Sequence, residues 1–188
     1  MSEGDRERWN ARYAGADPPR EPSSFLASLD GMLPRRGRAL DVAGGSGRNA
    51  LWLARRGLSV TLADVSDVAL STAARHAEAL ALPLETAVVD VETSPLPAGP
   101  WDVILCFEFL HRPLFAPFAR ALAPGGWLVV CHPTSSNLQR HPHPTARYLL
   151  GDGELPTLVA GLDVASYEEG WSETGRHEAR LVARAPGG

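Results

Sequence analysis

The segment over residues 39–50 holds residues whose types and spacing could bind a ligand. A short apolar run contains Asp41, then Gly44, Gly45 and Gly47 follow, and a helical pattern begins next. Glycines between a strand and a helix leave the backbone open to a ligand, close to the positive N-terminus of the helix. We therefore expect residues 39–50 to form a cofactor loop.

Two classes of cofactor fit this loop. Residues 45–50 satisfy the dinucleotide pattern G-x-G-x-x-A, which alone is weak evidence. Asp41 separates the two classes, because a carboxylate at the end of the first strand would repel a pyrophosphate. The same carboxylate would attract a cationic amino-acid group and a sulfonium.

Acidic residues also follow the next two expected strands. Asp64 ends the apolar run 58–63, and it lies 64 − 45 = 19 residues after Gly45. An acidic residue about 20 positions after the loop is placed to hold ribose hydroxyls. Asp90 ends the run 84–89 in the same way. These residues would meet at one edge of a parallel sheet.

Hydrophobic periodicity predicts the elements that would position these residues. The expected strands are 39–43, 58–63, 84–89, 101–106, 127–131, 163–168 and 177–183. The expected helices are 4–14, 23–33, 49–56, 67–81, 113–122 and 152–160. The helix over 23–33 would be capped by Ser23 or Ser24, with an inward stripe of Phe25, Leu26, Leu29, Met32 and Leu33. Leu122 to Gly126 is expected to form a helix end and a turn.

Four motifs then point to one family. The pattern D-x-A-G-G-x-G from Asp41 is similar to the first motif of class I S-adenosylmethionine (SAM) methyltransferases. Arg48-Asn49-Ala50 looks like the tellurite-resistance-type small-molecule branch. Residues 101–111 resemble the fourth-strand motif F-D-x-V-x-x-x-x-x-L-H, and residues 122–126 resemble L-x-P-G-G. Residues 9–13 resemble the W-x-x-R-Y opening of small-molecule methyltransferases, and the resemblance covers about residues 5–185.

The resemblance implies a fold, which the final strand pair supports. The connection over residues 169–176 has two glycines and no helical pattern, so strands 163–168 and 177–183 should be antiparallel. We expect a single Rossmann-like α/β domain with a doubly wound sheet of seven strands. The expected order is 3-2-1-4-5-7-6, with the last strand antiparallel.

The resemblance also assigns roles to residues. The cofactor would be SAM, with S-adenosylhomocysteine as its product; Asp64 would hold the ribose, Asp90 the adenine amino group, and Val91 would flank the ring. The expected cofactor-binding residues are Asp41, Ala43, Gly44, Gly45, Gly47, Asn49, Asp64, Val65, Asp90, Val91, Cys106 and Phe107. The substrate-binding candidates are Trp9, Arg12, Tyr13, Arg112 and Arg140, with His141, His143 and Arg147 also at the edge of the site. Glu108 and His111 are weak candidates for a general base. Gly44 departs from relatives, which commonly carry cysteine or another small residue there.

Composition limits the remaining possibilities. A chain of 188 residues fits one domain, over residues 1–188. Within it we expect an N-terminal flap and linker over residues 1–22, which contains Pro18, Pro19 and Pro22. We also expect a loop on the substrate side of the sheet over residues 132–150. A net charge of −4 and the absence of a basic stretch disfavour nucleic acid. No apolar run is long enough for a membrane span, and no signal peptide is expected, so a cytoplasmic location follows by default.

Three chemistries are disfavoured by particular residues. The eighteen basic residues are all arginines, which excludes a Schiff-base lysine. Cys106 and Cys131 lie in apolar runs and are expected to be buried thiols. His141 and His143 lack a third ligand nearby, so no metal site is expected.

The sequence therefore favours a SAM-dependent methyltransferase that acts on a small molecule by in-line transfer. Two alternatives remain open, a non-catalytic SAM-binding module and an NAD(P)-linked oxidoreductase. The sequence does not identify the methyl acceptor, the use of a base or the oligomeric state.

Overall fold

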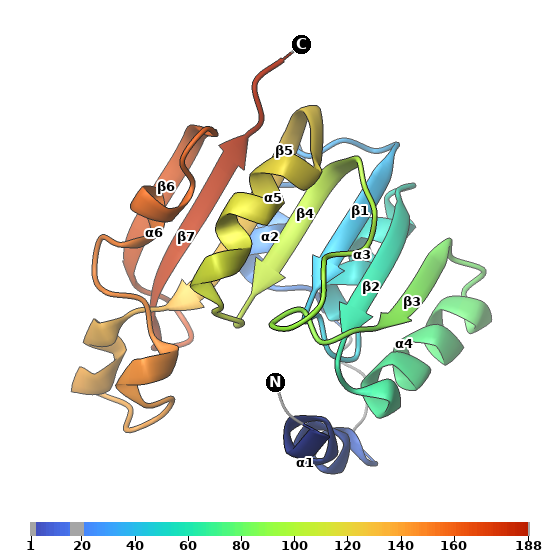
Figure 1. The fold of residues 1–188 in the computed structure, drawn as a ribbon, viewed down its shortest axis with the longest axis horizontal. Coiled ribbons are helices and arrows are strands. Elements are labelled where there is room, and N and C mark those ends of the chain that lie inside the picture. The colour runs from blue at the N-terminus through green and yellow to red at the C-terminus, as the bar shows by residue number, and fades with distance from the viewer. Residues whose placement is uncertain (1–2, 16–20, 188) are drawn as a thin grey trace.

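A computed structural model describes residues 3–15 and 21–187, so Pro18 and Pro19 of the expected linker lie outside the described residues. Its centre is a sheet of seven strands in the order β3-β2-β1-β4-β5-β7-β6 (Figure 1). The strands are β1 (Arg38–Val42), β2 (Ser59–Asp64), β3 (Leu84–Val88), β4 (Trp101–Phe107), β5 (Leu122–Pro133), β6 (Asp163–Trp171) and β7 (His177–Arg184). The expected strand order is confirmed.

The strand directions also agree with the expectation. β1 pairs in parallel with β2 and β4, β2 pairs in parallel with β3, and β4 pairs in parallel with β5. β7 is antiparallel to both β5 and β6. The carboxyl ends of β1, β2, β4 and β5 consequently lie at one edge of the sheet, where ligands bind in open α/β folds.

Helices cover both faces of the sheet. The α-helices are α1 (Glu3–Tyr13), α2 (Ser24–Ser28), α3 (Arg48–Arg55), α4 (Asp67–Ala79), α5 (Phe115–Ala121) and α6 (Leu155–Leu158). Figure 1 shows α5 and α6 in front of the sheet, with α2 and α3 behind it. None of the helices within residues 3–15 and 21–187 is both long enough and apolar enough to cross a membrane.

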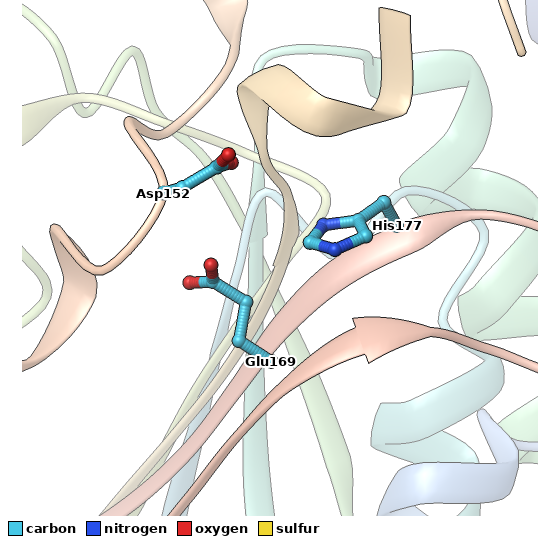
Figure 2. A group of neighbouring side chains, drawn as sticks. All are labelled: Asp152, Glu169 and His177. Atoms are coloured by element: carbon cyan, nitrogen blue, oxygen red, sulfur yellow. The ribbon is translucent and has the colours of Figure 1, made fainter. Parts of the chain in front are cut away.

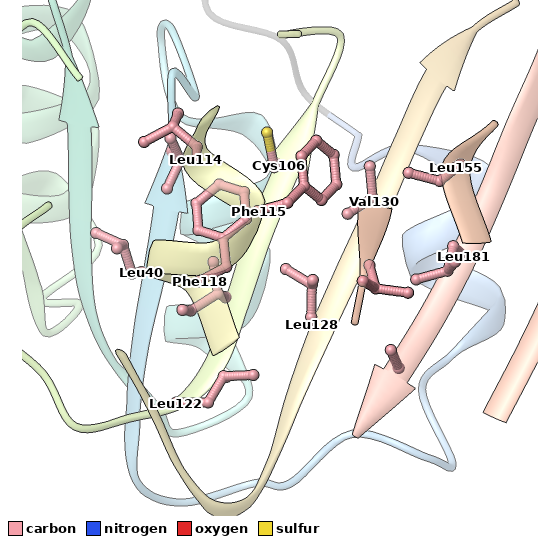
Figure 3. Close-up of a cluster of buried hydrophobic side chains, with 14 of the residues drawn as sticks. Leu40, Cys106, Leu114, Phe115, Phe118, Leu122, Leu128, Val130, Leu155 and Leu181 are labelled. Carbon is pink, nitrogen blue, oxygen red and sulfur yellow. The ribbon is translucent and has the colours of Figure 1, made fainter. Parts of the chain in front are cut away.

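Two hydrophobic clusters form the core, one on each face. On the α5 face, Phe115 and Phe118 pack over β4 and β5 (Figure 3). On the opposite face, Leu26 of α2, Leu53 of α3 and Leu70 of α4 share a second cluster. β4 supplies both clusters because successive side chains of a strand point to opposite faces. This burial on both faces explains why β4 reads as a continuous apolar run.

The helix expected over residues 23–33 is shorter than predicted. Only Ser24–Ser28 is helical, and neither serine caps it by its side chain. Beyond Ser28 the backbone makes turn bonds to residues three positions back, such as Met32 N to Leu29 O at 3.0 Å. The turns keep Leu29 and Leu33 buried but leave Met32 43% exposed, so Met32 was wrongly placed in the core.

Three further boundaries differ from the prediction. Residues 122–126 are not a turn but the start of β5, and Leu122 pairs with Trp101 across a register shift. The helix expected over 152–160 is reduced to α6. The loop over 132–150 contains two short 3₁₀ turns, Ser135–Gln139 and Ala146–Tyr148, beside the 3₁₀ turn Arg112–Leu114 that precedes α5.

Candidate cofactor and active site

The glycine loop is built from backbone that bulky residues could not adopt. Gly45 and Gly47 have φ angles of 58° and 82°, in the left-handed region that favours glycine. Ala43 also has a positive φ, 53°, which is uncommon for a residue with a side chain. A Cβ atom at Gly44 would lie 2.5 Å from both Asp41 Oδ2 and Leu62 Cδ1. The structure thus explains the absence of a side chain at position 44.

Asp64 is tied to this loop by hydrogen bonds. Its Oδ2 accepts from the backbone N–H of Gly45 at 2.8 Å, and its Oδ1 accepts from Ser66 N–H at 2.8 Å. Ser66 also caps α4, because its hydroxyl accepts from Ala69 N–H at 3.1 Å. Burial raises the pKa of Asp64, and the backbone hydrogen bonds oppose that effect. The carboxylate is therefore held at one position and is 8% exposed, at the carboxyl end of β2.

Asp41 lies beneath the loop rather than on its open side. It is fully buried, and among the described residues the only hydrogen-bond donor beside its two carboxylate oxygens is the backbone N–H of Ala50. Burial, with a smaller contribution from the Asp64 charge, raises the pKa of Asp41 to about 7. In this structure the carboxylate packs under Gly44, and the expected contact of Asp41 with the ligand stays a prediction.

A cavity of about 160 Å³ opens at the carboxyl ends of β1, β2 and β4. Its lining brings together residues from the glycine loop, the two strand ends and α1. The lining residues are Trp9, Arg12, Tyr13, Ala43, Asp64, Val65, Phe107, Glu108 and Phe109. Eight of these nine were candidate site residues from the sequence. Phe109 was missed, although its spacing of two from Phe107 was a usable signal.

Helix α1 closes over this cavity. A Cβ atom at Gly45 would collide with the Tyr13 hydroxyl, so Tyr13 lies directly against the loop. Asn10 joins α1 to the start of α4, donating from Nδ2 to Asp67 Oδ1 at 2.8 Å and accepting from Ser66 Oγ at 2.7 Å. Trp9 and Tyr13 stack with ring centroids 6.0 Å apart. The expected N-terminal flap therefore lies over the loop in this structure.

Glu108 forms one wall of the cavity and is held between two arginines. Its Oε1 lies 3.3 Å from Arg48 Nη2 and 3.0 Å from Arg176 Nη1. Glu108 has a positive φ of 56°, which turns the chain sharply after β4. Arg176 comes from the connection between β6 and β7, and sequence reasoning gave no sign of this contact.

The other predicted site residues lie around the cavity or away from it. Asn49 is buried, and its Oδ1 accepts from Ser23 N–H at 3.0 Å. Cys106 is buried, and its thiol donates to Phe109 O. Val91 is buried in the α5-side core, and Asp90 accepts from Glu92 N–H at 3.0 Å. These four residues do not line the cavity.

Among the catalytic and substrate candidates, His111, Arg112 and Arg140 do not line the cavity either. Arg112 is in a two-pronged ion pair with Glu154, at 2.5 and 2.7 Å. Arg140 lies over the ring of Trp171, 3.8 Å from its centroid. Their expected roles remain predictions.

Comparison with known proteins decides between the two cofactor classes. Residues 39–126 match the family model described as "Methyltransferase domain". The segment that contains the glycine loop therefore matches a methyltransferase domain.

Solved methyltransferase structures share the fold over nearly the whole chain. The N-methyltransferase NodS from Bradyrhizobium japonicum, in complex with S-adenosylhomocysteine, has a TM-score of 0.73 and 19% identity, covering 96% of this chain and 98% of that chain. TehB from Haemophilus influenzae has a TM-score of 0.73 and 19% identity, covering 96% of this chain and 66% of that chain.

A curated relative is more similar in sequence. The ubiquinone biosynthesis O-methyltransferase of Paracidovorax citrulli is 36% identical over an alignment of 112 residues, which covers 55% of this chain and 47% of that protein. The chain spans about half the length of the first curated relatives it matches.

The site residues fit SAM, the cofactor of this domain class. Asp64 offers ribose hydroxyls a fixed carboxylate, and the carboxyl group of Asp41 is buried beneath the loop. Typical ligand pockets hold about 300–1,000 Å³, more than the cavity beneath α1.

Proposed function

We propose that this protein transfers the methyl group of SAM to a small-molecule acceptor. The observation that carries the proposal is the cavity in which the Asp64 carboxylate, the Ala43 turn and the Phe107 ring meet. The matching domain model and the curated relatives, described as O-methyltransferases, support the same reaction class.

In this proposal the residues that bind the cofactor lie at the carboxyl ends of the parallel strands. Asp64 accepts hydrogen bonds from the ribose hydroxyls, and Val65 packs beside them. Asp90 and Val91 extend the site toward the adenine at the end of β3. Asp41 lies under Gly44 with its pKa raised to about 7, so above that pH its negative charge favours a cationic ligand on the loop.

The bound cofactor supplies an electrophilic methyl on a positively charged sulfur. Phe107 and Trp9 present aromatic faces to the cavity, and such faces stabilise a nearby cation. Glu108 is the candidate general base that lines this cavity. It would remove the proton from an acceptor whose nucleophilic atom is protonated. His111 is the second candidate, three residues further along the chain.

In this proposal α1 acts as a lid that opens for the cofactor and closes over the acceptor. Its support is the Asn10 attachment to Ser66 and Asp67, together with the Tyr13 contact on the loop. Excluding water and holding the acceptor near the methyl group are the protein's main contributions to an in-line displacement. Arg12, on the same helix, lines the cavity and would place a positive charge beside the bound methyl acceptor.

A methyl-acceptance screen tests the proposal. Purified protein is incubated with methyl-labelled SAM and a panel of thiols, chalcogen oxyanions, small amines and phenols. We expect labelled product from at least one class, and far less product from the Asp64→Asn variant at the same low SAM concentration. Cofactor binding without transfer to any class would instead favour a SAM-binding module without catalysis.

A further inference from the structure

Three metal-ligating side chains meet away from the cofactor cavity, at the outer end of the sheet. Asp152, Glu169 and His177 point toward a common space from separate segments (Figure 2). One ligand atom from each lies within 4.8 Å of the others. None of the three was a candidate from the sequence, because they are 8 to 25 residues apart and form no motif.

The strand pairing places two of these ligands side by side. Glu169 of β6 lies opposite Ala179 of β7, and His177 is two residues before Ala179. Glu169 and His177 are therefore diagonal neighbours on one face of the hairpin. Ala179 has a small side chain, so the space between the two ligands is not filled by a bulky residue.

The third ligand is brought in by a loop that is fixed at both sides. Leu150 forms a parallel bridge with Thr134, which directly follows β5. Gly153 N–H donates to Glu169 Oε2 at 2.9 Å, which ties the loop to β6. Asp152 lies between these two anchors, so its carboxylate is presented to the hairpin.

Outer groups orient each of the three ligands. Asp152 accepts from Ser136 Oγ at 2.6 Å and from Ser135 Oγ at 3.0 Å, and Glu169 accepts from the Tyr167 hydroxyl. His177 Nδ1 lies 2.6 Å from Thr134 Oγ1. Such outer contacts fix the tautomer and direction of metal-binding side chains.

The charge of the cluster also favours a cation. Two carboxylates face each other, and within residues 3–15 and 21–187 neither has an ion-pair partner. Their partners are neutral hydroxyl and amide donors. A divalent cation would neutralise this pair of charges.

We propose that Asp152, Glu169 and His177 bind a divalent transition cation such as Zn²⁺ or Mn²⁺. Imidazole and carboxylate ligands together suit these ions. Zinc–ligand bonds of about 2.0–2.2 Å allow two ligand atoms to be about 4 Å apart at most, so small side-chain rotations would close the site. Water molecules would complete the coordination, because Asp152 is exposed.

Calorimetric titration of the full chain with ZnCl₂, after chelator treatment, tests this proposal. We expect one equivalent of Zn²⁺ to bind, with a higher Tm in its presence. Glu169→Gln and His177→Asn should each lose this binding. The matched controls are Glu168→Gln, an exposed neighbour on the opposite face of β6, and His143→Asn in the 132–150 loop; both should bind as the original protein does.

The folded state of every variant is checked by circular dichroism without metal. If a hairpin variant fails to fold, Asp152→Asn in the exposed loop provides the same test. Absence of stoichiometric Zn²⁺ binding would overturn the proposal. Equal binding by Glu169→Gln and Glu168→Gln would also overturn it, because the ion would then occupy other groups. None of these readouts depends on methyl transfer, so failure of this site leaves the proposed function unaffected.

Discussion

The carboxylate of Asp64 accepts a hydrogen bond from the backbone N–H of Gly45, 2.8 Å from Oδ2. This bond joins the carboxyl end of β2 to the loop that follows β1, although the two residues are 19 positions apart. The group expected to bind the ribose thus also fixes the loop expected to hold the rest of the cofactor. Cofactor affinity should therefore depend on Asp64 in two ways, through direct contact and through loop geometry.

Replacing Asp64 by asparagine tests this double role. An amide has one acceptor atom, so it cannot satisfy both the Gly45 and Ser66 N–H groups and two ribose hydroxyls. Two charge-assisted hydrogen bonds at about 1.5 kcal/mol each predict a loss of S-adenosylhomocysteine affinity of about 100-fold. Calorimetry on Asp64→Asn measures this loss. Asp163→Asn, an exposed residue at the start of β6, is the matched control and should bind normally.

Gly44→Ala should be destabilising because the structure leaves no room for a methyl group. The added Cβ would meet Asp41 Oδ2 and Leu62 Cδ1 at 2.5 Å, and overpacking of this kind costs about 1–3 kcal/mol. Urea denaturation measures the change in the free energy of unfolding. Gly31→Ala is the control, since a Cβ there has no atom within 4 Å. Equal stability of the two variants would show that the loop can move away from position 44.

The buried Asp41 predicts a dependence of stability on pH. Its pKa is raised to about 7 in the folded protein from an ordinary value of 3.8, so folding takes up a proton between these values. The free energy of unfolding should consequently fall as pH rises from about 4 to about 7, by on the order of a few kcal/mol.

Asp41→Asn removes this contribution and should be more stable than the original protein above about pH 7. Denaturation at about pH 5 and about pH 8 compares the two. A smaller slope should persist in the variant, because burial also raises the pKa of Asp64. Identical pH profiles of the two proteins would contradict the assignment to Asp41.

The lid proposal predicts that turnover and folding respond differently to changes in α1. Removing residues 1–14 should lower the rate of methyl transfer far more than it lowers the free energy of unfolding. The same truncation should not weaken S-adenosylhomocysteine binding. In the closed arrangement Tyr13 lies against Gly45, so α1 covers the loop that is proposed to bind the cofactor and must move away before the cofactor enters. Asn10→Ala should lower turnover in the same direction by removing the contacts to Ser66 and Asp67.

Glu7→Gln, an exposed change on the same helix, is the control for the lid experiment. Steady-state kinetics with an identified acceptor give the turnover numbers. Unchanged kinetics after removal of residues 1–14 would exclude a lid function for α1.

The sheet could be predicted from the sequence because its signals are local. Apolar runs such as β4 end at turns, and the short connection before β7 allows only an antiparallel pair. The expected helix over residues 23–33 was too long because its apolar spacing suits a helix. Burial of Leu29 and Leu33 was correct, but turns rather than helix achieve it.

The candidate site was predictable where residues end adjacent strands, as with Asp64 and Phe107. Contacts between distant segments could not be predicted in this way. The Arg176 contact with Glu108 depends on how the β6–β7 hairpin meets the end of β4. The position of Asp41 beneath Gly44 depends on side-chain packing, which spacing along the chain does not encode.

The most direct test of the proposed function is calorimetric titration of the purified protein with S-adenosylhomocysteine, with NAD as the control. The proposal predicts micromolar binding of S-adenosylhomocysteine and no binding of NAD. Binding of NAD alone would contradict it, because the same glycine loop would then hold a pyrophosphate above the buried Asp41.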